Sequence, residues 1–353
     1  MEIMMKENIF TNNGENSIVV GRAATGLYLL LVANNIMGQR VLVPANLCYA
    51  AIYPIQYAGG IPTFCDVDRY SGNVTYDTFV NACTEDTVAA IVPHMYGNPV
   101  LDLDKIAFYC KAKNILLVED CASAMGAKSS YELGKIGDYT VYSTGYSKTI
   151  DLGIGGFVCS NRDLSPLLSL EKKLPEYNEQ AEEELTLFSK IYRVLRNEDH
   201  GTLIGKEIYE SIPKCCKDGF LYRISEETKQ WISNGVKDID EVICKRWQKY
   251  NYYIQRLKPI ENKIYNYSEG AVPWRFNLLL DKRERRIVIR NCLEKQLPVS
   301  DWYPSVMPLF GYTEETNNFP GIKWHEQHIL NFPLLLDDSK IDMICQTILE
   351  SLI

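Results

Sequence analysis

The side chains that could do chemistry lie at the ends of apolar runs in the first half of the chain. Asp120 directly follows the run ILLVE, Ser143 ends the run TVYS, and Lys148 comes shortly afterwards in YSTGYSK. Gly155 and Gly156 open the next apolar run. If these runs are neighbouring strands of one sheet, a carboxylate, a hydroxyl and an amine meet at a single edge of it, where such sheets bind ligands.

This set of groups fits pyridoxal phosphate (PLP). A lysine can form a Schiff base with PLP, an acid can keep its pyridine nitrogen protonated, and hydroxyl and backbone N–H groups can bind its phosphate. Gly21, Arg22 and Ala23, at the start of a predicted helix, would add N–H groups and the positive end of the helix dipole. Each element is common by itself, so the prediction depends on their order along the chain.

Residues 1–165 contain the elements that must position these groups. Short runs that are apolar on both faces alternate with helical stretches, at residues 21–37 and 103–113 for example. Such a pattern predicts an α/β fold with a doubly wound, mostly parallel sheet. The predicted strands fall at residues 40–45, 88–93, 114–119, 140–143 and 156–160.

The second half of the chain is richer in charge. Residues 164–217 are predicted to form a charged helical excursion, and residues 225–257 a single long helix. The tail has a strand in PWRFNLLL, a helix at 282–295 and a final helix at 338–353, which predicts a small α+β domain. We expect a large cofactor-binding domain over 1–235, and a connecting helix with the small domain over 236–353.

Composition limits the possible partners. The 353 residues carry a formal charge of −8 without a dense Lys/Arg run, so nucleic acid and membrane surfaces are not expected partners. No stretch is apolar and long enough to span a bilayer. The eleven cysteines lie mostly in apolar runs, which favours reduced thiols in the cytoplasm. With four histidines and no CxxC pair, no metal site is predicted.

The order of these segments resembles the sugar aminotransferase family of fold-type I PLP enzymes, the DegT/DnrJ/EryC/StrS group. The resemblance runs from about Gly21 to the C-terminus. GRAATGLYLLL resembles the family's SGTAAL helix start, VEDCASAMGA its EDAAQAHGA, GDYTVYSTGYSK its GDxxxFSFxPxK, and DWYP its HYP. It implies a large doubly wound domain, a smaller C-terminal domain, and a site at the interface of a homodimer.

The resemblance also implies residue roles. Lys148 corresponds to the Schiff-base lysine, Asp120 to the partner of the pyridinium nitrogen, and Ser143 to a phosphate ligand. Having Lys148 rather than His separates the chain from the family's dehydratase branch. The implied reaction moves an amino group from an amino acid, glutamate being the favoured donor, to a keto sugar nucleotide by way of pyridoxamine phosphate.

The sequence departs from the family pattern at several positions. Arg22 replaces Thr in SGTAAL and could supply charge to the phosphate. Cys48 stands where the family stacks an aromatic ring on the cofactor, and the adjacent Tyr49 could stack instead. In GFLYRIS, Leu221 replaces the Asn of GxNxRM, a segment that reaches a partner subunit's phosphate, while Arg223 is retained.

Further candidates follow from residue type. Ser123 stands in place of the Gln of EDAAQ, Arg275 could hold a substrate carboxylate or phosphate, and Tyr303 lies in a loop that could close the pocket. Because the protein is acidic, an anionic substrate would depend on Arg22, Arg223 and Arg275. Two alternatives stay open: another PLP-dependent reaction on a non-sugar substrate, and a non-catalytic binding protein of the same fold.

Overall fold

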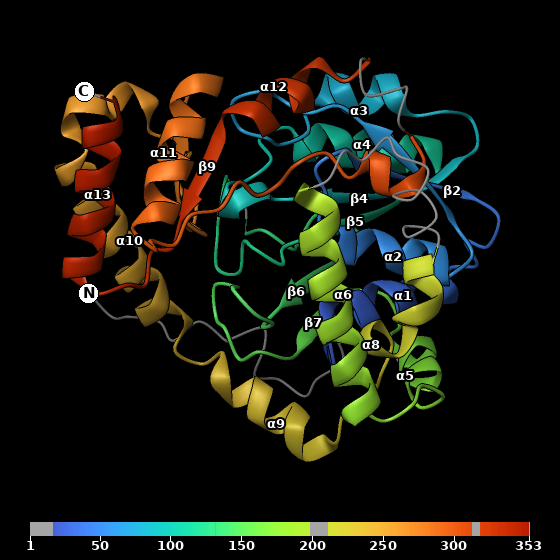
Figure 1. Cartoon of the computed structure of the whole chain (residues 1–353). Helices are drawn as coiled ribbons and strands as arrows, with labels where there is room; N and C mark the ends of the chain where they lie inside the picture. The colour runs from blue at the N-terminus through green and yellow to red at the C-terminus, as the bar shows by residue number, and fades with distance from the viewer. Residues whose placement is uncertain (1–16, 131, 198–210, 313–317, 353) are drawn as a thin grey trace, which may run out of the picture.

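The computed structural model describes residues 17–130, 132–197, 211–312 and 318–352. A large domain surrounds a seven-stranded sheet, and a small domain built on a two-stranded sheet lies beside it (Figure 1). The strands are β1 (Ser17–Val20), β2 (Arg40–Pro44), β3 (Ile61–Cys65), β4 (Thr87–Pro93), β5 (Leu116–Asp120), β6 (Tyr139–Ser143), β7 (Gly156–Cys159), β8 (Phe276–Leu279) and β9 (Ile329–Phe332).

The large sheet confirms the predicted doubly wound architecture. Its strand order is β1-β7-β6-β5-β4-β2-β3. Strands β2 to β6 run parallel to their neighbours, whereas β7 is antiparallel to both β6 and β1. The five predicted strands correspond to β2, β4, β5, β6 and β7. The central strands β4, β5 and β6 are almost entirely buried, as the continuous apolar runs indicate.

Two edge strands, β1 and β3, were not among the predicted strands. Strand β3 contains Pro62, which cannot donate to a sheet ladder and is tolerated at an edge. Strand β1 has only four residues, and its alternating burial gives a weak apolar signal. Strand length and edge position thus explain why a search for continuous apolar runs misses both.

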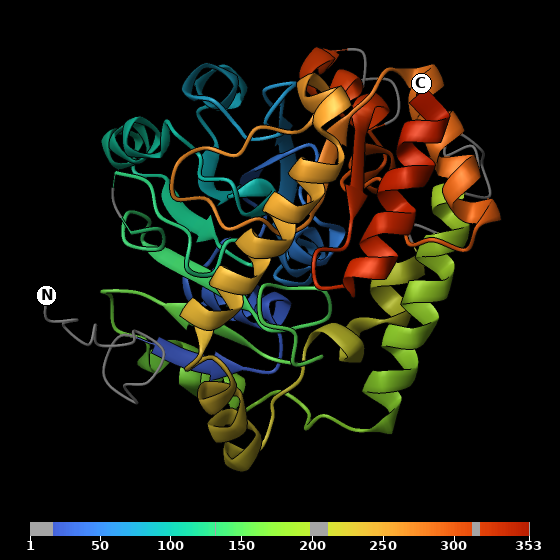
Figure 2. The ribbon, with the colours of Figure 1, turned by 90° about the vertical axis from the view of Figure 1, so that its left-hand side faces the viewer.

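Helices cover both faces of the large sheet (Figures 1 and 2). Helix α1 is shorter than the predicted stretch of residues 21–37, because it starts after the extended Arg22 and ends before Asn34 and the left-handed Asn35. Helix α4 matches its predicted bounds. The helices of this domain are α1 (Ala23–Ala33), α2 (Tyr49–Tyr57), α3 (Tyr76–Ala82), α4 (Leu103–Lys113), α5 (Ser165–Glu171), α6 (Glu179–Asn197), α8 (Lys217–Phe220) and α9 (Glu226–Gly235), with a short 3-10 turn η1 (Met95–Gly97).

The charged excursion is mostly helical where the structure describes it, apart from the connection at residues 172–178. Helix α6 packs against α8, and Phe188 of α6 lies against Phe220 of α8 with ring centroids 5.3 Å apart. Residues 198–210, which complete the predicted excursion, lie outside the described part of the chain. Aromatic packing between α6 and α8 therefore holds the excursion against the large domain.

The predicted single helix over 225–257 is wrong. Helix α9 ends at Gly235, and α10 (Ile239–Arg256) begins after a short connection. A side chain at position 235 would meet Leu152 at 2.8 Å, so glycine, a poor helix former, stands where another segment packs closely. Helix α10 then contributes Ile243 to a core cluster of the large domain and Tyr253 to the core of the small domain.

The small C-terminal domain has the predicted α+β composition. Strand β8 pairs with β9 in an antiparallel register, and α10, α11 (Lys282–Glu294) and α13 (Asp338–Leu352) enclose the pair's apolar face (Figures 1 and 2). Asp281 and Glu284 form a reciprocal capping box at the start of α11. Helix α12 (Pro320–His328) and the 3-10 segments η2 (Lys258–Lys263) and η3 (Met307–Phe310) complete the elements. Across the described residues, every helix is too short or too polar to cross a lipid bilayer.

Candidate active site

A cavity of about 290 Å³ lies at the carboxyl ends of the central strands. Asp120 ends β5, Ser143 ends β6, and Lys148 follows in the loop between β6 and β7. This is the edge at which the sequence predicts chemistry. The predicted residues that line the cavity are Arg22, Ala23, Tyr49, Asp120, Ser123, Ser143, Lys148, Arg275 and Tyr303.

Two predicted site residues do not line the cavity of this chain. Gly21 packs against Tyr222, whose ring would lie 2.4 Å from a side chain at position 21. The absence of a side chain at Gly21 therefore lets Tyr222 pack closely against the backbone. Arg223 points elsewhere: its guanidinium forms an ion pair with Glu176 at 2.6 Å and donates to the carbonyl of Leu174 at 3.2 Å.

The loop that carries Lys148 is tightly organised. Asp151 accepts hydrogen bonds from the backbone N–H groups of Ser147, at 2.7 Å, and Gly153, at 3.0 Å. The Lys148 amine reaches into the cavity, where Nζ lies 3.4 Å from the hydroxyl oxygen of Ser123. The loop therefore presents a primary amine to the cavity from a defined backbone position.

Asp120 is a buried carboxylate that is only partly satisfied. One oxygen accepts the backbone N–H of Ala122 at 2.9 Å. Burial raises the pKa of Asp120, while the Ala122 N–H and the Lys148 amine oppose that rise. Among the described residues, its second oxygen has no hydrogen bond. A ligand with a cationic N–H group would pair with this oxygen and stabilise the ionised acid.

The other end of the cavity could hold a phosphate. The N-terminus of α1 opens here at Ala23, beside the Ser143 hydroxyl. A side chain at position 156 would lie 2.7 Å from the backbone nitrogen of Ala23, so Gly156 lets β7 pass close to the helix start. Arg22 adds positive charge, and its guanidinium lies 5.5 Å from the centre of the Phe220 ring. Helix N–H groups, a hydroxyl and an arginine suit a phosphate.

The excursion helix α6 contributes to the cavity wall. Ser189 lines the cavity, and the neighbouring Phe188 packs on Tyr49 with ring centroids 4.6 Å apart. Tyr49 also approaches Trp302, at 6.4 Å. Cys48 lines the cavity next to Tyr49, and burial raises the pKa of its thiol. Ser189 was not predicted as a site residue from the sequence. The amphipathic pattern of α6 shows which face of the helix is apolar, but it does not show which polar residues beside that face reach the cavity.

A second missed feature is the support of the Tyr303 loop. The backbone N–H of Tyr303 donates to the Tyr96 hydroxyl at 3.0 Å, and that hydroxyl lies 2.8 Å from Nε2 of His325. Nδ1 of His325 lies 2.8 Å from the carbonyl of Arg69. Burial lowers the pKa of His325 to about 4, so the ring is neutral at neutral pH and can accept from Tyr96.

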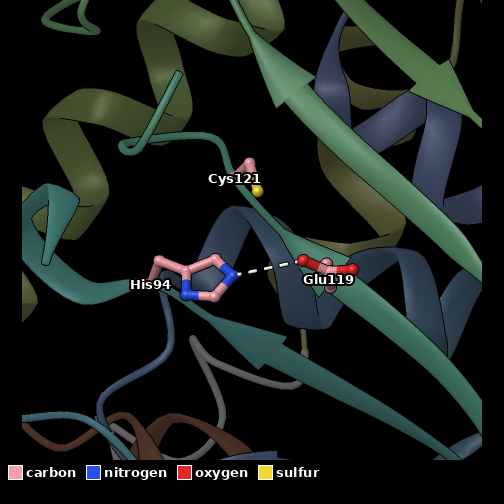
Figure 3. A group of neighbouring side chains, drawn as sticks. All are labelled: His94, Glu119 and Cys121. Carbon is pink, nitrogen blue, oxygen red and sulfur yellow. Dashed lines mark ion pairs between the residues drawn. The ribbon is translucent and has the colours of Figure 1, made fainter. Parts of the chain in front are cut away.

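His94, which lines the cavity, forms a fully buried cluster with Glu119 and Cys121 (Figure 3). The His94 ring accepts the Val100 N–H through Nδ1, and its Nε2 lies 3.5 Å from Glu119. The Glu119 carboxylate accepts three backbone N–H groups, from Gly134, Ile136 and Gly137. Burial raises the pKa of the Cys121 thiol well above its usual range. A saturated carboxylate and a protonated thiol fit a structural network better than metal ligands.

The doubly wound sheet, the small C-terminal domain and the cavity that holds Lys148 and Asp120 together have the arrangement of fold-type I transferases. The family model described as the DegT/DnrJ/EryC1/StrS aminotransferase family matches residues 10–349. The chain belongs to this family, and it is an aminotransferase.

Individual relatives agree with this assignment. The chain is 25% identical to GDP-perosamine synthase of Escherichia coli O157:H7, over 98% of this chain and 88% of that protein. Its fold is similar to that of the aminotransferase TlmJ from Streptoalloteichus hindustanus, with a TM-score of 0.75 and 22% identity over 97% of this chain and 87% of TlmJ. It is also similar to DesI, solved in the presence of its TDP-sugar product, with a TM-score of 0.73 and 19% identity over 95% of this chain and 80% of DesI.

Proposed function

We propose that this chain transfers an amino group from an amino acid, with glutamate as the favoured donor, to a keto sugar nucleotide, and that PLP is its cofactor. The observation that carries the proposal is one cavity that contains both the Lys148 amine and the partly unsatisfied Asp120 carboxylate. The sugar-nucleotide substrate is supported by the relatives, one of which is a GDP-perosamine synthase.

Different residues of the cavity would bind different parts of the cofactor. Arg22, the N–H groups at Ala23 and the Ser143 hydroxyl would hold the phosphate, and Asp120 would hold the ring nitrogen protonated. When bound, PLP would supply an aldehyde that reacts with the amino donor and a ring that withdraws electrons from the donor's α-carbon. Lys148, once the donor has taken its place, would act as general base and acid: it would take the proton from the donor's α-carbon and deliver it to the carbon that carried the aldehyde.

Arg275 is the candidate for an anionic group of the substrate. Its guanidinium donates to the hydroxyls of Ser300, at 3.0 Å, and Ser147, at 2.8 Å, and lies over the Trp274 ring at 4.6 Å. Burial lowers the pKa of Arg275, and within the described residues it forms no ion pair. A partly buried cation held only by neutral groups favours a carboxylate or phosphate from the substrate.

A homodimer in the cytoplasm is part of the proposal. Tyr146 lines the cavity, yet 84% of it is exposed. A second subunit over this residue would exclude water from the cavity, as the family's interface site implies. Buried free cysteines such as Cys65 and Cys292 support a reducing compartment.

The proposed function is tested by adding PLP to the purified protein and then adding amino donors one at a time. We expect a visible absorbance band from the lysine linkage, which glutamate converts to the pyridoxamine phosphate spectrum. If the protein does not bind PLP, the proposed reaction is contradicted and the alternative of a non-catalytic binding protein is favoured. Binding of PLP without conversion by any donor would favour a different PLP-dependent reaction.

Replacing Arg275 by alanine is expected to raise KM for one anionic substrate by roughly 10- to 100-fold, because hydrogen bonds to charged groups contribute about 1.5–3 kcal/mol. Steady-state kinetics of the two half-reactions measures this change. A KM rise with the amino donor assigns its carboxylate to Arg275, and a rise with the sugar nucleotide assigns its phosphate. Arg290→Ala, which alters an exposed arginine of α11, is the control. Unchanged KM values in both half-reactions would remove Arg275 from the site.

A further inference from the structure

Arg246 is a buried cation in the middle of α10 that binds two separate segments of the chain. It is 5% exposed. Its Nη2 donates to the carbonyls of Lys148, at 2.7 Å, and Thr149, at 3.0 Å, and its Nε also donates to Thr149, at 3.2 Å. Its Nη1 donates to the carbonyls of Pro273, at 3.3 Å, and Trp274, at 2.9 Å. One guanidinium therefore holds the lysine loop against the segment that leads to Arg275.

Burying a guanidinium lowers the stability of the fold unless its N–H groups form hydrogen bonds. Within the described residues Arg246 forms no ion pair, and all its hydrogen bonds go to backbone carbonyls. Burial lowers its pKa to about 10, so the group still carries its charge at neutral pH. The planar fork of arginine can reach several acceptors in different directions at once, which a lysine ammonium on one atom cannot do.

The carbonyls on both sides of the lysine are bound in the same manner. The indole N–H of Trp274 donates to the carbonyl of Ser147 at 2.6 Å. Ser147, Lys148 and Thr149 thus each have their carbonyl bound by a side chain from elsewhere in the chain. This loop lies between β6 and β7 and has no regular helix or strand, so these contacts determine where the lysine backbone lies.

We propose that Arg246 is a positioning residue for the reaction, which sets the Lys148 amine and the Arg275 guanidinium at a fixed separation. The proposal rests on the proposed function and adds to it a residue that lies outside the cavity lining. Because Arg246 does not line the cavity, it would touch neither substrate nor cofactor. It acts through the backbone of Lys148 on one side and of Trp274 on the other.

The test uses the full-length apoprotein of Arg246→Gln and Arg246→Lys. The first measurement is the rate at which added PLP forms the borohydride-reducible linkage with Lys148, a readout independent of turnover. We expect this rate to fall roughly 10-fold or more in both variants, since neither side chain can bind the two segments together. Arg246→Lys keeps the positive charge, so the rate can still be measured with this variant even if Arg246→Gln does not fold.

The second measurement is a double-mutant cycle between Arg246→Lys and Arg275→Ala, using KM for the anionic substrate. If Arg246 positions Arg275, the two effects are expected to be less than additive. Tyr250→Phe is the matched control, because Tyr250 lies one turn along α10 and donates to the carbonyl of Tyr265 at 3.0 Å. That variant is expected to lower Tm without slowing the linkage reaction.

Two outcomes would separate this inference from the function on which it rests. If the Arg246 variants lose only Tm, form the linkage as fast as the wild type and give additive KM effects, Arg246 is merely structural. If the wild type itself forms no linkage with PLP, the proposed function fails.

Discussion

Lys148→Ala is expected to bind PLP without forming the borohydride-reducible linkage, and to lose at least roughly 10³-fold in amino transfer. Proton transfer by a positioned side chain typically contributes 10²–10⁴-fold, and here the same amine also forms the covalent linkage. In this structure Lys148 is the lysine that lines the described cavity. The measurements are the visible spectrum with PLP and the rate of the glutamate half-reaction.

Lys135→Ala is the matched control for this experiment. Lys135 lies in the loop before β6, is half-exposed and pairs weakly with Glu132 at 3.9 Å. Its loss is expected to leave both spectrum and rate unchanged. The assignment of Lys148 as the linkage lysine would be disproved if the Lys148→Ala variant kept normal turnover and borohydride reduction fixed PLP to another lysine.

Asp120→Asn is expected to lower the amino-transfer rate by roughly 10²- to 10⁴-fold, because loss of one partner of a buried charge pair costs about 3–5 kcal/mol. The amide has nearly the same shape, so the change isolates the charge. Burial raises the pKa of Asp120, whereas a cationic ring nitrogen beside it would lower that pKa and stabilise the ionised form. The rate is measured in the half-reaction with saturating PLP.

The pairing of the Asp120 carboxylate with a cationic ring nitrogen also predicts how cofactor affinity depends on pH. As the pH falls through the raised pKa of Asp120, the acid takes up a proton and loses its attraction for the cationic nitrogen. PLP affinity of the wild type is therefore expected to fall toward acid pH, and that contribution is expected to vanish in Asp120→Asn. Asp138→Asn, at the opposite end of the sheet beside the start of β6, is the control. An Asp120→Asn profile identical to that of the wild type would contradict the role of the acid.

The sheet was largely predictable, because buried parallel strands have continuous apolar runs. The edge strands β1 and β3 lack such runs, and the break between α9 and α10 depends on contact between Gly235 and Leu152, which are far apart in the sequence. The break shows that tertiary packing can end a helix where local periodicity continues.

The candidate site was predictable where chemistry follows a strand. Asp120, Ser143 and Lys148 line one cavity because neighbouring parallel strands end at the same edge. Arg223 could not be placed from its motif, since its partners Leu174 and Glu176 come from the excursion. Arg246 resembles an ordinary arginine of an amphipathic helix, and only its burial against two distant segments distinguishes it.

Helix α10 contributes side chains to the cores of both domains. Its first turns complete a core cluster of the large domain through Ile239 and Ile243, and its last turns complete the small-domain core through Tyr250 and Tyr253. A polypeptide ending at residue 235 would leave apolar surface of the large domain exposed and the carbonyl of Lys148 without its guanidinium donor. We therefore expect the large domain not to fold by itself, and we expect the small domain and the lysine loop to unfold in one cooperative step.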